Sequence, residues 1–434
     1  MKEVYYQFKF TGEPWIDAGI LGFWDYIEGK EETGSKFNVR LKPRDYSISG
    51  QSSHGIESFL TEIVDDIKNN SYIQQSGNRI CVYSKAKDDF EIVNKINLVN
   101  IVAKLYNAGT GALKPLPEGK CQLSEVKFQQ WEKLREKYKG QGVDFKIDGN
   151  NHVYCSPPQY SWPHFKPNLA PKKQTICAFC GATNACSKIH SNNYPFLVPT
   201  GNWSNFYSNL SLELRMCNLC EIASFFAVNK VFFNINWGKK RLFMAIPHAS
   251  SLPEIKDFWN DVKGLDKLRR VKMLTQSSNI FEANEGYEYA YLNETTVAFA
   301  YKLYIALKAT TEADRLLKMA RTKTWHFLLA DTSGKSISFG NYTLLDDMHR
   351  LFKLFSKVEG EEIDFTSMFS QLSIKEGKDS SNNLYREALS EKIIKNASIN
   401  EIAEKVMWKK EQKIGGFSKF VKIYNLFKEA NYVG

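Results

Sequence analysis

The hydrophobic pattern of residues 1 to about 170 predicts a mixture of strands and helices. Apolar and polar side chains alternate in the stretch VYYQFKF, which is typical of a half-buried β-strand. Three later stretches repeat apolar side chains every three or four residues, the spacing of an amphipathic helix. They are residues 15–29, 54–69 and 124–138. Gly29 is a possible stop for the first of these helices.

The middle of the chain begins with a stretch that does not fit regular structure. Residues 152–173 contain five prolines, so we expect a linker there. The pattern is β-like from about 226 to 250 and mainly helical from about 254.

Beyond residue 320 the pattern predicts one hairpin followed by helices. The hairpin covers 325–340 and turns at Ser333-Gly334. Four stretches with apolar stripes follow, at residues 344–358, 383–396, 399–414 and 417–430. We expect these four helices to form a small bundle with loop-like connections.

Length and composition limit the class of protein. A chain of 434 residues with 43% hydrophobic and 24% charged residues can form two or three packed domains. The opening residues carry charges where a signal peptide needs an apolar run. The most apolar tract, residues 222–235, is interrupted by Lys230 and is too short to cross a bilayer. We therefore expect a cytoplasmic protein without a membrane segment, whose eight cysteines are thiols.

Two Cys-x-x-Cys pairs are the clearest chemical signal. Cys177 and Cys180 form the first pair, and Cys217 and Cys220 form the second. Two such pairs fit a tetrahedral structural zinc site, and a long intervening loop adds little closure entropy. Gly181 follows the first pair, where a tight knuckle needs a permissive backbone, and the second pair opens a predicted helix. This order is typical of a treble-clef-like zinc finger.

Other interpretations of the cysteines remain open at the sequence level. Buried reduced thiols, one redox pair or an iron–sulfur cluster are the alternatives to zinc. Cys186 and His190 could each replace a ligand of the first pair. The other three cysteines are widely spaced, and we expect them to be ordinary core or surface residues; they are Cys81, Cys121 and Cys155.

Together these patterns predict an α+β, multidomain fold with a mixed N-terminal part, an inserted zinc module and a mainly helical C-terminal bundle. We place the N-terminal domain at 1–165 and the zinc-binding module with its four cysteines at 166–225. A strand hairpin with a helical region follows at 226–330, and the helical bundle covers 331–434.

The net charge of +10 is concentrated around the zinc module. Residues 151–280 contain 15 Lys or Arg against 6 Asp or Glu. Two basic clusters lie there, one in a predicted hairpin turn and one after a predicted helix: Lys239, Lys240 and Arg241, and Lys267, Arg269, Arg270 and Lys272. Such clusters beside a zinc finger suit contacts to a phosphate backbone. The alternative is an ordinary solvated surface.

Sequence signatures of catalysis are absent. The segment SGKS ends like a phosphate-binding loop, but Leu329 stands where that loop needs glycine. No zinc-protease or nucleophile-elbow motif occurs, nor does a His-Asp pair. We therefore expect a protein that is not an enzyme.

The stretch FTGEPWIDAGILGF, residues 10–23, precedes the two cysteine pairs by about 150 residues. From its own residues we expect Trp15, Ile16 and Ile20 to pack in a core, and Asp17 to cap or orient a neighbouring loop. In motif and order, however, this stretch and the two pairs resemble the CXXC–CXXC family of CRISPR-associated large subunits, those of type I-B Cascade surveillance complexes.

The resemblance implies a non-catalytic subunit in a complex of guide RNA, target DNA, backbone subunits and handle-binding subunits. Such a subunit recognises a short protospacer-adjacent motif on duplex DNA, stabilises the opened target and recruits a separate helicase-nuclease. A small subunit can accompany it. Lysines of the third C-terminal helix would then line a channel for a displaced strand, or else form the solvated face of the bundle; they are Lys405, Lys409, Lys410 and Lys413.

A function of another class stays open beside this one. The chain could be a zinc-finger nucleic-acid-processing enzyme, a nuclease or an RNA-modifying protein, with an active site that the sequence does not reveal.

Overall fold

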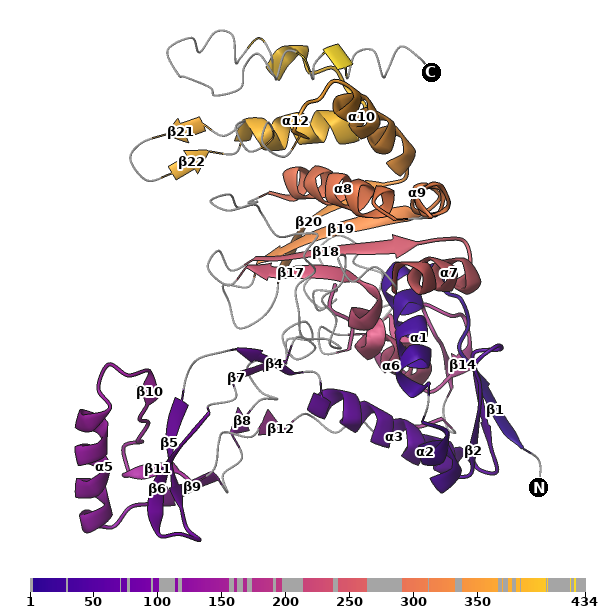
Figure 1. Ribbon diagram of the computed structural model, residues 1–434. Helices are drawn as coiled ribbons and strands as arrows, with labels where there is room; N and C mark the ends of the chain where they lie inside the picture. The colour runs from indigo at the N-terminus through magenta and orange to yellow at the C-terminus, as the bar shows by residue number, and fades with distance from the viewer. Residues whose placement is uncertain are drawn as a thin grey trace, which may run out of the picture.

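The computed structural model describes residues 3–404 with interruptions, and residues 422, 425 and 426 beyond them. The longer interruptions are residues 101–113, 162–166, 197–213, 264–290 and 332–337. Helices and sheets are mixed along the chain, and the region after residue 345 is mainly helical, so the fold is α+β (Figure 1). In the part of the chain that is described, no helix is both long and apolar enough to span a bilayer.

The N-terminal region pairs three strands with three helices. The antiparallel sheet has the order β1-β3-β2, and its strands are β1 (Val4–Gln7), β2 (Val39–Lys42) and β3 (Ser47–Gly50). The helices are α1 (Pro14–Ile27), α2 (Glu31–Lys36) and α3 (Ser53–Asn70). The predicted strand and the first two predicted helices, α1 and α3, are confirmed. Helix α1 ends at Ile27, with Glu28 as its C-cap, and Gly29, the predicted stop, lies outside the described residues.

A small lobe follows, drawn beside the main body in Figure 1. Its elements are β5 (Arg79–Ser84), β6 (Asp89–Asn94), β9 (Lys120–Gln122), α5 (Glu125–Lys137), β10 (Val143–Asp144) and β11 (His152–Tyr154). Helix α5 is the third predicted N-terminal helix, and Ser124 caps it by accepting a hydrogen bond from the Lys127 amide. The lobe has its own hydrophobic cluster of Cys81, Leu123, Trp131 and Val153. Two short strand pairs lie nearby in sequence, β4 (Tyr72–Gln75) with β7 (Asn97–Asn100) and β8 (Lys114–Pro115) with β12 (Tyr160–Ser161).

A four-stranded antiparallel sheet forms the centre of the main body. Its order is β17-β18-β19-β20, with β17 (Phe232–Asn236), β18 (Arg241–His248), β19 (Thr324–Asp331) and β20 (Ser338–Leu345). Both predicted hairpins are confirmed as strand pairs, although their turns lie outside the described residues. Trp325 and Phe327 are buried with Phe232 and Phe299, and burying each such ring stabilises the fold by roughly 1.5–3 kcal/mol.

Helices cover both faces of this sheet. Helix α8 (Leu292–Lys308) contacts β19 and β20, while α1 contacts β18 (Figure 1). The other helices around the sheet are α7 (Leu252–Lys263) and α9 (Ala313–Arg321).

The C-terminal region begins later than the sequence pattern suggests. A helix was expected from residue 344, but β20 continues to Leu345 and α10 (Met348–Gly360) follows it. Asp347 sets this start, because its carboxylate accepts a hydrogen bond from the Arg350 amide at 3.1 Å. The later elements are β21 (Ile374–Glu376), β22 (Ser380–Asn382) and α12 (Leu384–Ile394).

The last two predicted helices, at 399–414 and 417–430, fall mostly outside the described residues. The lysines predicted to line a channel or to form a solvated face also lie outside them; they are Lys405, Lys409, Lys410 and Lys413. The four-helix bundle therefore stays a prediction.

One large hydrophobic cluster joins the segments of the main body. It runs from Phe8 to Leu426 and contains side chains from each of the four predicted ranges. The division into four domains stays a prediction.

Candidate metal centre

The first cysteine pair lies in a knuckle between two short strands, β13 (Thr175–Ile176) and β14 (Thr183–Asn184). The Gly181 amide donates to the Cys177 carbonyl at 3.1 Å, and the Cys177 amide donates to Ala182 at 3.0 Å. Gly181 has a φ of 68°, in the left-handed region that glycine adopts without strain. The predicted need for glycine at this knuckle is confirmed.

The second pair lies where a strand turns into a helix. Strand β15 (Cys186–Lys188) pairs with β16 (Arg215–Cys217), and α6 (Asn218–Phe226) begins immediately afterwards. Cys217 is the N-cap of α6 and Cys220 lies in its first turn. The helix N-terminus therefore faces the sulfurs, where its partial positive charge stabilises thiolates.

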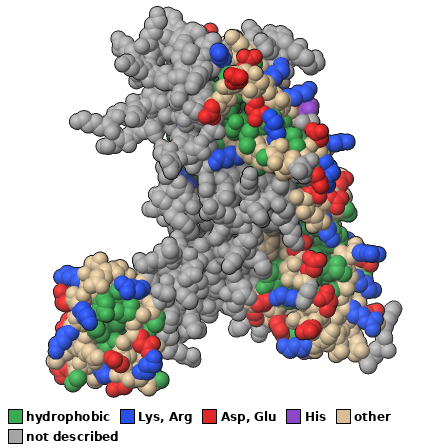
Figure 2. All heavy atoms as spheres, in the orientation of Figure 1, with side chains coloured by type: hydrophobic (Ala, Val, Ile, Leu, Met, Phe, Trp, Pro, Cys, Tyr) green, Lys and Arg blue, Asp and Glu red, His purple; other side chains and the backbone are tan. Residues whose placement is uncertain are grey.

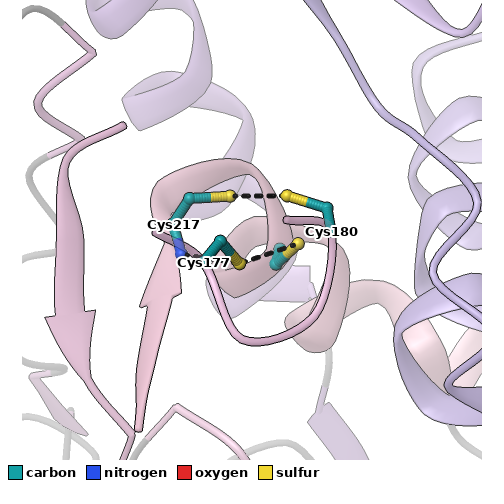
Figure 3. Close-up of side chains that lie close together, drawn as sticks. Cys177, Cys180 and Cys217 are labelled. Atoms are coloured by element: carbon teal, nitrogen blue, oxygen red, sulfur yellow. Dashed lines mark hydrogen bonds between the residues drawn. The ribbon is translucent and has the colours of Figure 1, made fainter. Parts of the chain in front are cut away.

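The four sulfurs form one compact group (Figure 3). They lie within 4.8 Å of one another, with 3.8 Å between Cys177 and Cys220 and 3.7 Å between Cys180 and Cys217. A tetrahedral ion with zinc–sulfur bonds of about 2.3 Å requires sulfur–sulfur distances of about 3.8 Å. The four cysteines can therefore hold a metal ion such as zinc.

The electrostatics of the group also favour a cation. Hydrogen bonds with the thiols of Cys180, Cys217 and Cys220 hold the pKa of Cys177 well below its usual range. The Cys217 amide donates to the same sulfur at 3.3 Å. The pKa values of Cys217 and Cys220 are raised, first of all by their hydrogen bonds to Cys177. Four thiolates together would repel one another strongly, so a divalent ion would bind with release of protons.

Cys186 and His190, the two residues that the sequence offers as alternative ligands, are not seen in this group among the described residues. The Cys186 thiol donates instead to the Thr175 carbonyl at 3.3 Å, and Cys186 is not part of the four-cysteine group. His190 lies outside the described residues.

Helix α6 is fixed to the main body by a close crossing with α1. A methyl group on Gly19 would overlap the carbonyl oxygen of Ala223, and one on Gly22 would overlap that of Phe226. Glycine at these two positions therefore lets the two backbones touch. The Trp15 indole N–H donates a buried hydrogen bond to the Ser224 hydroxyl of α6 at 3.1 Å, which joins the two helices.

The loop before α1 is organised by a buried carboxylate. Asp17 is fully buried and accepts hydrogen bonds from the Thr11 amide and hydroxyl, both at 2.8 Å, and from the Gly12 amide at 2.9 Å. The expectation that Asp17 orients a neighbouring loop is confirmed. Glu13 caps α1 by accepting from the Ile16 amide and also accepts from the Tyr194 hydroxyl at 2.8 Å, which links this loop to the cysteine module.

A group of rings and polar side chains beside Asp17 was not expected from the sequence. His248 Nε2 lies 3.0 Å from the Asp17 carboxylate, and the His248 ring is 5.8 Å from that of His326. His326 Nδ1 lies 2.8 Å from the Tyr342 hydroxyl. Burial, with a smaller effect of His248, lowers the pKa of His326 to about 4. Asp17 and His248 are 231 positions apart, so no local motif could have paired them.

The predicted phosphate-binding residues are mostly outside the described part of the chain. Lys239 and Lys240 lie outside it, as do the four residues of the second cluster, Lys267, Arg269, Arg270 and Lys272. Arg241 opens β18, and its guanidinium lies over the Tyr291 ring at 5.7 Å. On the face shown in Figure 2, positive and negative side chains of the described residues are interspersed.

Comparison with known proteins adds no relative to these observations. No protein-family model matches the sequence, and no curated protein matches it either.

Proposed function

We propose that the chain is the non-catalytic large subunit of an RNA-guided type I-B CRISPR surveillance complex. One observation carries the proposal: the two separate motifs behind the family resemblance form a single structural unit. The N-terminal motif supplies Trp15, Gly19 and Gly22 to the crossing with α6, and α6 supplies two of the four cysteines. A shared structural role explains why a chain would carry both motifs in this order.

In this proposal the cysteine module is a treble-clef-like finger with a structural zinc ion. Its knuckle, strand pair and helix follow one another as in that class of finger. The ion would fix α6, which precedes β17 in the chain, relative to the body of the protein. Pairing with the guide supplies most of the sequence specificity, so the protein needs to read only a short motif on the duplex.

Of the three basic residues of the β17–β18 hairpin, Lys239 and Lys240 are better suited to a binding test than Arg241. Arg241 packs over Tyr291, so its replacement would also disturb the fold. The double variant Lys239→Ala/Lys240→Ala removes two charges and leaves this packing in place. We expect it to weaken duplex binding by the assembled complex about tenfold at low salt and less at high salt. Its metal content should equal that of the wild type.

The proposal itself is tested by purifying the tagged chain from its native cells and sequencing the RNA that accompanies it. We expect short RNAs with a common 5′ handle and different guide sequences, together with backbone and handle-binding subunits. A chain that elutes alone and free of such RNA would overturn the proposal. Added target duplex should then recruit the separate helicase-nuclease, and a small subunit if one exists.

The ring cluster favours one alternative, a zinc-finger nucleic-acid-processing enzyme. His248, His326 and Tyr342 could transfer protons if a substrate reached them, because imidazoles and phenols are common acids and bases. Against this, Asp17 already uses its carboxylate to hold the loop before α1. Cleavage or modification of RNA or DNA by the isolated chain, abolished in His326→Gln but not in Lys239→Ala/Lys240→Ala, would favour the enzyme.

A further inference from the structure

The small lobe brings together two cysteines that lie far apart in the sequence. Strands β9 and β11 are antiparallel, with Cys121 opposite Val153 and Lys120 opposite Tyr154. The Cys155 amide donates to the Gly119 carbonyl, which continues the ladder by one pair. Alternate residues share a face, so Cys121 and Cys155 lie diagonally on the same side of this two-stranded sheet.

Glycine opposite Cys155 leaves room between the two cysteines on this face. Gly119 has no side chain, so the Cys155 side chain can lean across the ladder toward Cys121. The two thiols are neighbours on this face, and the Cys121 thiol contributes to a raised pKa of Cys155. Lys120 and Tyr154 occupy the opposite face, where the Lys120 ammonium lies 5.4 Å from the centre of the Tyr154 ring, and they do not obstruct the thiols.

We propose that Cys121 and Cys155 are a reversible redox site, which a low-molecular-weight disulfide such as oxidised glutathione converts into a disulfide bond. The Cys121 thiolate attacks the small disulfide, forms a mixed disulfide and releases one small thiol. The Cys155 sulfur then loses its proton to solvent and attacks Cys121, and the second small thiol leaves. The two protein thiols lose two electrons and the small disulfide gains them.

The order of the two steps follows from the surroundings of Cys155. Burial, and after it the neighbouring Cys121 thiol, raises the pKa of Cys155 to about 12, so Cys155 stays protonated at neutral pH. Attack on the external disulfide therefore begins at Cys121, and Cys155 acts as the resolving thiol.

The bond would close the segment between the two strands, which carries α5 and β10. Both ends of that segment would then be covalently joined, and its opened states would lose conformational freedom. The lobe has a hydrophobic cluster of only four buried side chains among the described residues. A disulfide bond would therefore add a large fraction to the stability of the lobe. We infer that oxidation makes the lobe markedly more resistant to local unfolding.

Cys81 provides a matched control within the same lobe. It lies on β5 and belongs to the same buried cluster, and burial raises its pKa to about 11. Its sulfur does not form a compact group with those of Cys121 and Cys155, unlike the four cysteines of the metal centre. Cys81 should therefore remain a thiol under conditions that oxidise the pair.

The experiment uses the full metal-loaded chain in glutathione buffers of stepped oxidised-to-reduced ratio. After alkylation and digestion, mass spectrometry should find a reducible cross-link between the Cys121 and Cys155 peptides. Its yield should rise with the oxidised fraction, and it should be the same in Cys81→Ser. Cys155→Ser should instead accumulate a glutathione adduct at Cys121. Metal content, measured in parallel, separates this reaction from oxidation of the metal centre.

A second measurement uses the wild-type protein and therefore does not depend on the folding of a variant. Limited proteolysis of the wild type should cut within residues 122–154 at least fivefold more slowly after oxidation, and reductant should restore the rate. The proposal is overturned if Cys81 enters the cross-link, or if both thiols stay reduced while the urea-unfolded chain is oxidised in the same buffer. An unchanged cutting rate in the cross-linked protein would overturn the stabilising role.

Discussion

The two groups of neighbouring cysteines lie in regions of different construction. Two of the four cysteines of the candidate metal centre lie at the start of α6, and the other two lie in the knuckle between β13 and β14. Helix α6 is buried in the large hydrophobic cluster and crosses α1 at two glycines. Cys121 and Cys155 lie on a two-stranded sheet at the edge of a small cluster. The number and support of the sulfurs differ, and so does the chemistry that each group favours.

The comparison teaches how the surrounding frame selects the chemistry of a thiol. Four sulfurs held about 3.8 Å apart by a rigid frame fit around one ion. A disulfide between any two of them would leave only two sulfurs to bind the ion. Two sulfurs alone cannot complete a tetrahedral site, but they can exchange electrons. Variants that affect one region and spare the other therefore test the distinction.

The largest effect is expected from removing a metal ligand. Cys217→Ser should abolish stoichiometric metal binding and lower the free energy of unfolding by about 4–6 kcal/mol, because the binding energy of the ion is coupled to folding. Cys186→Ser is the matched control, since the Cys186 thiol lies near the centre but bonds to Thr175. Elemental analysis and urea unfolding would measure both quantities. Full metal content in Cys217→Ser would contradict the assignment.

Much of this centre was predictable from the sequence, because its signals are local. The Cys-x-x-Cys spacing, Gly181 after the first pair and the helix after the second are each read within a few residues. The helices α1, α3 and α5 and the two hairpins were predictable for the same reason, since their periodicity is visible in short windows.

Contacts between distant segments were not predictable in this way. The Cys121–Cys155 pair depends on the register of two strands and on Gly119 opposite Cys155, neither of which the spacing of the cysteines reveals. Asp17 and His248 meet only because α1 packs against β18. The end of β20 was missed because Leu344 and Leu345 fit a helical stripe as well as a strand.

The next largest effect should be confined to the small lobe. Trp131 is buried in its cluster and contacts the rings of Phe128 and Phe145. Trp131→Ala should destabilise the lobe by about 3–5 kcal/mol and leave the metal content unchanged. Val126 on the same helix is 74% exposed, so Val126→Ala should shift stability by less than about 0.5 kcal/mol. Hydrogen exchange of α5 would measure the change, and loss of the metal in Trp131→Ala would show that the two regions unfold together.

A smaller effect is expected where α1 crosses α6. Gly19→Ala places a methyl group against the carbonyl of Ala223, so the helices must separate at a cost of about 1–3 kcal/mol. Gly149 in the small lobe has open space around the same position, which makes Gly149→Ala a suitable control. The thermal midpoint of the metal-loaded protein should fall in the first variant alone. A stable Gly19→Ala protein with normal metal content would show that the frame of the centre is looser than the structure indicates.

The smallest effect separates the two regions by pH. The pKa of His326 is lowered from 6.5 to about 4 in the folded protein. As the pH falls from 6.5 toward 4, the unfolded chain therefore binds a proton at this residue before the folded protein does. The contribution of His326 to stability is complete above pH 6.5 and is lost over this range. The contribution is on the order of 1–2 kcal/mol once partial exposure is allowed for. Urea unfolding at pH 7 and pH 5 should therefore show a smaller pH difference in His326→Gln than in the wild type.

The small lobe should respond in a lower pH range. Hydrogen bonds from the backbone amide of His152 and from that of Asn150 lower the pKa of Asp148 from 3.8 to about 2. That contribution is present above pH 3.8 and is lost as the pH falls toward 2. Between pH 6.5 and 5, hydrogen exchange should therefore speed up in the central sheet before it does in β9 and β11. Asp148 holds the turn that leads into β11, so Asp148→Asn should remove the loss of lobe stability at low pH. The pH response of the central sheet, which depends on His326, should stay unchanged. If the lobe of Asp148→Asn still loses stability at low pH, other carboxylates cause that loss.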